Sequence, residues 1–402
     1  MRIRQVMSVG NNKQFHWCML RPGQRLISIL CGILVLILLS SSAAAEDTWH
    51  GIERIVAIGD VHGDYEQFVA VLRSAKLIDL QDSWSGGKTH LVQTGDILDR
   101  GPDSRKVMDL LMKLEKEARR AGGWVHCLIG NHEAMNIYGD LRYVSSGEFA
   151  AFRDRNSEKA REELYKQDQE QIKGSSPPDK VPAFDDAFQK KWEAEHPLGY
   201  AEHRRELGPT GKYGKWIRSH NAVIRIDKTL FLHGGIGPKY VDLKVRLMNE
   251  RVRDELEDFT KLQGGIVMDG EGPLWYRGLA QGDEMALEPH VKAVLKTHQA
   301  ERIVLGHTPK EGAILPRFGG KVLLIDVGLS RVFDQRGRMA CLLIENGRSY
   351  ALHRGTKLEL PSDSTTGLVS YLKQAAALDP SPSSLEKRIA EIEARAPAPV
   401  HE

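Results

Sequence analysis

Five short apolar runs in this sequence each end at a glycine that lies beside a residue whose side chain could bind a metal ion. The runs are IVAIGDVHGD (55–64), HLVQTGDILDRG (90–101), WVHCLIGNHE (124–133), TLFLHGGI (229–236) and RIVLGHTP (302–309). Apolar runs of four to six residues that alternate with helical or loop segments are typical of α/β architecture with interior strands. Open α/β sheets place their sites beyond the carboxyl ends of their strands, so we expect these five ends to form one site.

The apolar pattern also predicts the order of the elements. Helices are expected over 65–78 and 103–120, where apolar residues recur at helical spacing. Strands are expected at 54–58, 90–94, 124–129, 221–226, 229–232, 302–305 and 321–326.

Two segments depart from this alternation. Residues 141–215 contain a charged helix, a Pro-containing turn and a second helix, which we interpret as a helical insertion. The insertion is either a solvated surface or a cap beside the substrate cleft. After about residue 356 the strand pattern stops, and Pro/Ser-rich linkers surround short helical pieces. We therefore predict a catalytic domain over 46–355 and a peripheral C-terminal tail over 356–402, with possible partial disorder.

The first 45 residues are predicted to be a signal peptide or a signal anchor. A basic segment precedes the apolar run LISILCGILVLILL (26–39), and the small residues SSSAAA (40–45) follow it. This order is typical of a signal peptide, cleaved here near Ala45. The alternative is an uncleaved anchor, because the run extended through SSSAAA reaches the length of a membrane-spanning helix. Both interpretations predict that the protein is exported, to the periplasm or the exterior in a bacterium. The protein would contact the membrane only through this segment, and only if the segment is not cleaved.

Composition excludes some classes of partner and site. The formal net charge is +2, and no Lys/Arg-rich stripe is interleaved with aromatic residues, so no nucleic-acid partner is expected. Only Cys127 and Cys341 lie in the body of the chain, which is too few for a disulfide framework. We predict two buried thiols, with a single disulfide as the alternative.

The polar residues at the five strand ends form a mixed set of metal donors. Two carboxylates, one amide and three imidazoles suit manganese, iron or zinc better than the all-oxygen sets of calcium and magnesium. No thiolate takes part, so a Cys-rich structural zinc site is excluded. The adjacent glycines permit the unusual dihedrals and close approach that a crowded ion site requires. The donors are Asp60, His62, Asp96, Asn131, His233 and His307.

These motifs resemble a known family. GDVHGD, GDILDRG and GNHE, followed by HGG and GH, resemble the signature of the phosphoprotein phosphatases within the calcineurin-like metallophosphoesterases, over about residues 52–330. The patterns GNHEAMN, KWIRSHNAVIRI and LWYRG are most similar to the Shewanella-like protein phosphatases. LLIDVGLS stands where eukaryotic serine/threonine enzymes have SAPNYC, so their regulatory subunits and toxin sensitivity are not carried over. The resemblance implies a four-layer α/β/β/α sandwich with a helical insertion.

The resemblance also implies a centre with two divalent metal ions. Asp60 and His62 would hold the first ion, and Asp96 would bridge both. Two ions about 3.5–4 Å apart can share a water whose pKa falls far enough to supply hydroxide near neutral pH. Water would then be the nucleophile, and no phospho-enzyme is expected. The second ion would be completed by Asn131, His233 and His307.

Further roles follow from the same resemblance. His132 and Asp99 resemble an acid pair in which the carboxylate orients the imidazole that protonates the leaving oxygen. Arg100 and Arg277 are the expected phosphate-binding residues, because a guanidinium offers two parallel hydrogen bonds to phosphate. Asp64 is expected to cap the helix that starts near Tyr65 instead of binding metal.

The residues alone predict metal-assisted hydrolysis of a phosphoester, and the resemblance adds a phosphoprotein or phosphopeptide substrate. Two alternatives stay open at this point. One is a hydrolase of dinucleoside polyphosphates or other small phosphoesters, which shares the motifs. The other is a non-catalytic binding protein on the same scaffold, although that predicts a broken donor set. Preference for phosphoserine/threonine or phosphotyrosine also stays open.

Overall fold

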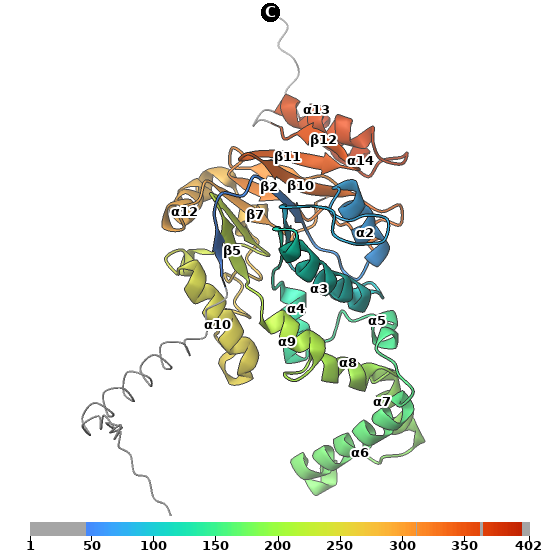
Figure 1. The fold of residues 1–402 in the computed structure, drawn as a ribbon. Helices are drawn as coiled ribbons and strands as arrows, with labels where there is room; N and C mark the ends of the chain where they lie inside the picture. The colour runs from blue at the N-terminus through green and yellow to red at the C-terminus, as the bar shows by residue number, and fades with distance from the viewer. Residues whose placement is uncertain (1–45, 311, 362–364, 396–402) are drawn as a thin grey trace, which may run out of the picture. The chain divides into compact units, whose positions relative to one another are not determined.

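A computed structural model describes residues 46–310, 312–361 and 365–395 of the chain (Figure 1). The predicted leader over residues 1–45 lies outside the described residues. Within the described ranges, none of the helices has the length and apolar character needed to cross a bilayer.

Two six-stranded sheets form the centre of the fold. The first sheet has the spatial order β1 (Thr48–Trp49), β5 (Val223–Ile226), β6 (Thr229–Leu232), β7 (Arg302–Leu305), β9 (Val322–Leu324) and β8 (Leu315–Arg317). The second has the order β12 (Thr356–Glu359), β11 (Arg348–His353), β10 (Ala340–Glu345), β2 (Arg54–Ile58), β3 (His90–Gln93) and β4 (Trp124–Cys127).

Each sheet contains three neighbouring parallel strands. They are β6, β7 and β9 in the first sheet and β2, β3 and β4 in the second. These strands are buried along nearly their whole length, which is why they appear in the sequence as continuous apolar runs. The expected strands at these positions are confirmed to within three residues at each end. The strands β1, β8, β10, β11 and β12 were not expected.

Helices pack beside both sheets (Figure 1). Helix α3 (Ser104–Arg120) packs on β4 and on α2 (Tyr65–Ser74), whereas α10 (Val245–Glu257) packs on β5. Asp64 caps α2 by accepting a hydrogen bond from the backbone N–H of Gln67 at 3.2 Å, as predicted. The predicted α/β class with two sheets and covering helices is confirmed. The remaining helices near the sheets are α4 (Asn131–Tyr138), α9 (Lys212–Arg218), α11 (Gly278–Gln281), α12 (Glu284–Thr297) and the 3₁₀ turns Pro238–Tyr240 and Phe259–Lys261. A further 3₁₀ turn, Pro178–Lys180, lies in the helical insertion.

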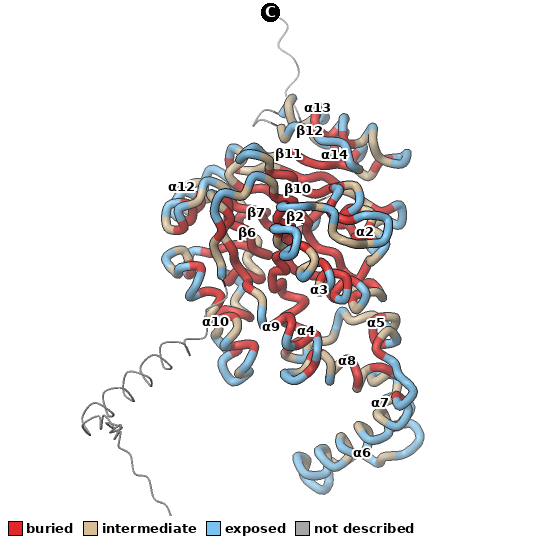
Figure 2. Tube along the Cα trace, in the orientation of Figure 1, coloured by how far each residue is buried: buried red, intermediate tan, exposed pale blue. Residues whose placement is uncertain are grey.

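The helical insertion is present, with more helices than the two expected. It contains α5 (Ser146–Ala151), α6 (Ser157–Ser175), α7 (Asp186–Glu195) and α8 (Tyr200–Leu207). The expected second helix is divided into α7 and α8, because Pro197 lies between them and Gly199 has a left-handed φ of 96°. Figure 2 shows that α6 is largely exposed. The distal part of the insertion is therefore a solvated surface.

The sequence predicts that the strand pattern stops after about residue 356, and the last strand extends slightly beyond that point. Residues 356–359 form β12, which pairs with β11 at the edge of the second sheet. Only Leu358 of this strand is buried, so its sequence lacks an apolar run that would have predicted it. The short helical pieces expected after it are present as α13 (Thr365–Ala376) and α14 (Leu385–Arg395), and Tyr371, Leu372 and Leu385 are buried in the common apolar core.

Cys127 and Cys341 are both buried and unpaired, so the prediction of two buried thiols is confirmed.

Asp379 joins the C-terminal helices to the second sheet. Its carboxylate accepts hydrogen bonds from His353 Nε2 at 2.9 Å, Arg354 Nε at 2.8 Å and Ser383 Oγ at 2.7 Å. Burial raises the pKa of Asp379, but these three donors lower it more strongly, to about 2. The ionised carboxylate therefore favours the folded state.

Replacing Asp379 by asparagine is expected to lower the free energy of unfolding by about 1–2 kcal/mol at pH 7. Because the pKa is depressed in the folded state, the stabilisation is complete above the unfolded pKa of about 4 and disappears as the pH falls towards about 2. Urea unfolding at several pH values measures the difference between the two proteins. Asp242→Asn, at an exposed position, is the control, and equal stabilities of the two variants at pH 7 would contradict the assignment.

Candidate functional site

The six predicted donors lie together where the strand ends of the two sheets meet. Asp60 and His62 follow β2, Asp96 follows β3, and Asn131 begins α4 just after β4. The other two, His233 and His307, follow β6 and β7 of the first sheet. All six side chains are buried.

His233 lies at the centre of the group. Its Nε2 is 2.8 Å from Asn131 Oδ1, 3.2 Å from Asp96 Oδ2 and 3.0 Å from His307 Nδ1. On the other side of Asp96, His62 Nε2 lies 3.9 Å from Asp96 Oδ2 and 3.9 Å from Asp60 Oδ2. Asp96 therefore faces both halves of the group, as expected for a bridging carboxylate.

The ring nitrogens that face the group cannot all hydrogen bond to one another. His233 Nδ1 lies 2.9 Å from the carbonyl oxygen of Thr94, and His307 Nε2 lies 3.2 Å from that of Trp275. Because a carbonyl oxygen only accepts hydrogen bonds, these two nitrogens carry the protons. His233 Nε2 and His307 Nδ1 then present lone pairs to each other. A shared cation resolves this conflict, so the donor set fits a metal ion.

His62 follows the same rule. Its Nδ1 lies 3.0 Å from the carbonyl oxygen of Leu98, which leaves the Nε2 lone pair facing Asp60 and Asp96. Burial lowers the pKa of His62 to about 3, so the ring is neutral at ordinary pH. The neutral imidazole is the form that coordinates metals.

A further buried carboxylate, Asp326, was not predicted. It follows β9 and lies beside Asp60. Burial raises the pKa of Asp60 well above its ordinary value, and the charges of Asp326 and Asp96 raise it further. Three carboxylates in a dry site repel one another unless a cation is present. The sequence signal that could have identified Asp326 is the apolar run VLLI that precedes it. Unlike the predicted donors, Asp326 follows its run without an adjacent glycine.

Glu133 holds the backbone around the donors and was also not predicted. Its carboxylate accepts hydrogen bonds from the N–H groups of Asp96 and Ile97, both at 2.7 Å, of Leu98 at 3.3 Å and of Gly130 at 2.8 Å. It therefore joins the loop after β3 to the start of α4. The fourth residue of GNHE has a structural function that its motif alone does not reveal.

Five predicted site residues have a left-handed backbone. Such a conformation costs a non-glycine residue about 1–3 kcal/mol and persists only where neighbours enforce it. Here it turns successive side chains of each loop towards the same point. The residues, with φ between 45° and 72°, are His62, Asp96, Asp99, Arg100 and His307.

The predicted acid pair is in hydrogen-bonding contact. His132 Nδ1 lies 2.5 Å from Asp99 Oδ2, and Asn136 Nδ2 donates to Asp99 Oδ1 at 2.8 Å. Burial lowers the pKa of His132, but Asp96 and Asp99 raise it above its ordinary value overall. His132 Nε2 lies 3.7 Å from Asp96 Oδ2, so the ring borders the group of donors.

Both predicted phosphate-binding arginines lie at this site. The guanidinium of Arg100 lies over the rings of Tyr143 and Phe333, and its Nε has no hydrogen-bond partner among the described residues. Arg277 Nη1 donates to the carbonyl oxygen of His307 at 2.7 Å and to Thr308 Oγ1 at 3.1 Å. It is therefore anchored to the loop of one predicted metal ligand.

The insertion contributes to the site through its first and last helices. Glu148 of α5 accepts a hydrogen bond from the N–H of Asp99 at 3.1 Å. Arg204 of α8 donates to the carbonyl oxygen of Asn136, near the end of α4. The proximal insertion thus supports the backbone of Asp99 and the C-terminal end of α4, the helix that carries His132.

Two other features lie apart from this site. Glu115, Cys127 and His220 could hold a metal ion by residue type, but the Glu115 carboxylate already accepts from His220 Nε2 at 2.9 Å and from Trp216 Nε1 at 3.0 Å. A satisfied carboxylate does not require an ion.

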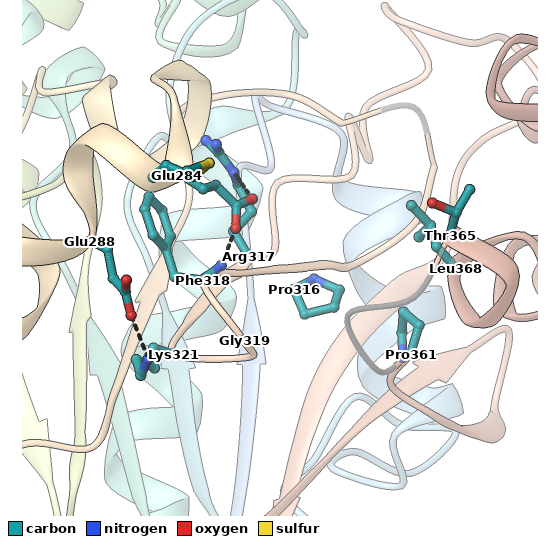
Figure 3. Close-up of a pocket in the computed structure, with 11 residues that line it drawn as sticks. Glu284, Glu288, Pro316, Arg317, Phe318, Gly319, Lys321, Pro361, Thr365 and Leu368 are labelled. Atoms are coloured by element: carbon teal, nitrogen blue, oxygen red, sulfur yellow. Dashed lines mark hydrogen bonds and ion pairs between the residues drawn. The ribbon is translucent and has the colours of Figure 1, made fainter. Parts of the chain in front are cut away.

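The second feature is a hollow of about 480 Å³ lined by residues of α12, β8 and the start of α13 (Figure 3). Its charged side chains pair with each other, Glu284 with Arg317 and Glu288 with Lys321. None of the predicted site residues lines it.

Two facing sheets flanked by helices, with buried nitrogen and oxygen donors at the strand ends of both, define a metallophosphoesterase. The chain belongs to the calcineurin-like phosphoesterase family, which it matches over residues 53–311. The chain is a metallophosphatase enzyme, so the alternative of a non-catalytic binding protein on the same scaffold is excluded.

Three relatives illustrate the similarity. Shewanella-like protein phosphatase 2 of Arabidopsis thaliana is 32% identical over 69% of this chain and 72% of its own. Shewanella-like protein phosphatase 1 of Plasmodium berghei is 26% identical over 70% and 68%. A solved structure, the cold-active protein-tyrosine phosphatase of a psychrophilic Shewanella species, has a TM-score of 0.60 and 30% identity, covering 78% of this chain and 82% of that one.

Replacing Gly95 by alanine is expected to lower the free energy of unfolding by about 2–5 kcal/mol and to abolish hydrolysis. Gly95 has a φ of 97°, and a Cβ there would lie 2.6 Å from both N and Cα of Gly130, beside Asn131. Urea unfolding and a phosphatase assay measure the two effects.

The matched control is Gly87→Ala. Gly87 also has a positive φ, 56°, but a Cβ there meets no atom within 4 Å. It should cost only about 1 kcal/mol and leave hydrolysis intact. Equal losses in the two variants would show that the contact between Gly95 and Gly130 is unimportant.

Proposed function

We propose that this chain hydrolyses phosphomonoesters of phosphoproteins or phosphopeptides, with phosphotyrosine as the favoured residue. The observation that carries the proposal is the 2.5 Å contact between His132 and Asp99 beside a buried group of metal donors. The names of the relatives support a protein substrate, and the tyrosine phosphatase of known structure supports phosphotyrosine.

The donor set fits two divalent cations, with manganese, iron and zinc as the suited metals. Asp60 and His62 would hold one, Asp96 would bridge both, and the rest of the set would complete the second. When bound, the cations would lower the pKa of a shared water enough to make it a nucleophile near neutral pH. That water would then supply the oxygen that bonds to phosphorus opposite the leaving oxygen, so that no phospho-enzyme would form.

His132 supplies the proton that the leaving group needs. Its Nδ1–H donates to Asp99, which orients the ring. Burial lowers the pKa of His132, but Asp96 and Asp99 raise it overall, which favours the imidazolium form that carries a second proton on Nε2. As the bond between phosphorus and the leaving oxygen breaks, that proton passes from Nε2 to the leaving oxygen. The Asn136 amide and the buried Glu148 hold Asp99 in position for this transfer.

Arg100 and Arg277 bind the phosphate. A guanidinium can form two parallel hydrogen bonds to phosphate oxygens and stabilise the charge of the transition state. The unpartnered Nε of Arg100 is available for such a bond. The anchoring of Arg277 to the His307 carbonyl supports its role beside the same ligand.

Asp96→Asn and His132→Asn are expected to lower kcat by about 10²-fold or more, for different reasons. Asp96→Asn removes a bridging charge, so metal analysis should show fewer than two ions per chain. His132→Asn removes only the proton donor, so its metal content should equal that of the parent. Retained phosphatase activity in both variants would overturn the mechanism.

The role of His132 as an acid also predicts a dependence on the leaving group. His132→Asn should lower kcat/KM by about 10²–10⁴-fold for phenyl phosphate, whose phenoxide needs a proton. The loss should be at least about tenfold smaller for 4-nitrophenyl phosphate, because its more acidic phenol leaves without one. Steady-state kinetics with a series of aryl phosphates measures this, and equal losses across the series would exclude His132 as the acid.

The competing activity is hydrolysis of a dinucleoside polyphosphate. Comparing turnover of a phosphotyrosine peptide with that of diadenosine tetraphosphate separates the two. Faster turnover of the nucleotide would overturn the proposed protein substrate.

A further inference from the structure

Two exposed aromatic side chains lie over the guanidinium of Arg100. Tyr143 is 41% exposed and Phe333 is 37% exposed. Arg100 Cζ lies 5.0 Å from the centre of the Tyr143 ring and 5.5 Å from that of Phe333. Tyr143 precedes α5, and Phe333 lies between β9 and β10, so distant segments of the chain supply the two rings.

The same rings border the reacting groups. The Tyr143 ring centre lies 5.1 Å from that of His132, and the Phe333 ring centre lies 5.7 Å from that of His62. A phosphate bound by Arg100 and a leaving oxygen protonated by His132 would therefore lie next to both aromatic side chains. The first atoms of the leaving group would pass between them.

Hydrogen bonds restrain the backbone that carries each of the two rings. The N–H of Arg100 donates to the carbonyl oxygen of Tyr143 at 2.9 Å, so Tyr143 is fixed to the residue whose guanidinium it covers. Near Phe333, Arg331 donates to the Asp64 carboxylate through Nε at 2.9 Å and Nη2 at 2.8 Å. These bonds restrain the loop that carries Phe333, and a preorganised contact loses less entropy on binding.

We propose that Tyr143 and Phe333, named here the aromatic rim, select substrates whose phosphate is bonded directly to an aromatic ring. The phenyl ring of phosphotyrosine reaches the rim and offers it a face or an edge for aromatic packing. The single methylene of phosphoserine offers no such surface. In a nucleoside polyphosphate the ribose separates the base from the phosphate chain. The inference rests on the proposed hydrolysis of phosphopeptides and names the residues that determine its specificity.

The test compares two peptides of one sequence that carry either phosphotyrosine or phosphoserine. Tyr143→Leu and Phe333→Leu remove each ring but keep apolar volume, whereas Tyr143→Phe and Phe333→Tyr keep a ring. Each leucine variant of the full chain is expected to lower the phosphotyrosine to phosphoserine ratio of kcat/KM by about tenfold, mainly through a higher KM for phosphotyrosine. The ring-keeping variants should retain at least half of the parent ratio.

Phe259→Leu is the matched control, because Phe259 is 44% exposed and lies in a separate 3₁₀ turn. It should change neither kcat/KM value. An unchanged ratio in both leucine variants would overturn the inference while the proposed function stands. A parent with no preference for phosphotyrosine would overturn the inference together with the proposed tyrosine preference, and would leave only the proposed hydrolysis of phosphopeptides. A parent that hydrolyses neither peptide would overturn the proposed function itself.

Discussion

The crowding of unprotonated donors around His233 is the constraint on which the rest of the site depends. The backbone carbonyls of Thr94 and Trp275 accept hydrogen bonds from the N–H groups of His233 and His307. The other ring nitrogens of these two histidines therefore face each other with lone pairs, 3.0 Å apart. Buried carboxylates add negative charge to the same space. Such a group is unfavourable in a dry interior without a cation. The protein therefore has to bring the donors together rigidly, and the two-sheet fold does this by joining the ends of three parallel strands from each sheet.

Rigid loops follow from this requirement. Each loop must turn its side chains inwards within a few residues of a strand end, which explains the left-handed backbone of His62, Asp96 and His307. The strain is offset by buried hydrogen bonds, notably the four N–H groups held by Glu133. The N–H of His307 donates to Asp60 Oδ1 at 3.0 Å and so ties the two sheets together through a ligand.

Much of the centre could be predicted because each predicted metal donor follows a buried apolar run, a pattern that is local in sequence. Asp326 could not be predicted in this way, because no glycine lies beside it and none of the motifs that carry the family resemblance contains it. The strand β12 was not predicted because only Leu358 in it is buried, so it has no apolar run. Its strand conformation depends on backbone pairing with β11. Left-handed φ values at non-glycine residues and the convergence of Tyr143 with Phe333 arise only from tertiary packing, which has no local signature.

The insertion has one end beside the site and the other end exposed to solvent. Its distal helix α6 is largely exposed, whereas its proximal helices contact the backbone of Asp99 and of α4 through Glu148 and Arg204. Tyr143, which opens the insertion, is bonded through its carbonyl to Arg100. A change in the insertion can therefore alter which leaving groups reach Arg100 and His132 without touching any metal donor. Under the proposal made above, the strand ends carry out the reaction and the loops that hold Tyr143 and Phe333 select its substrate.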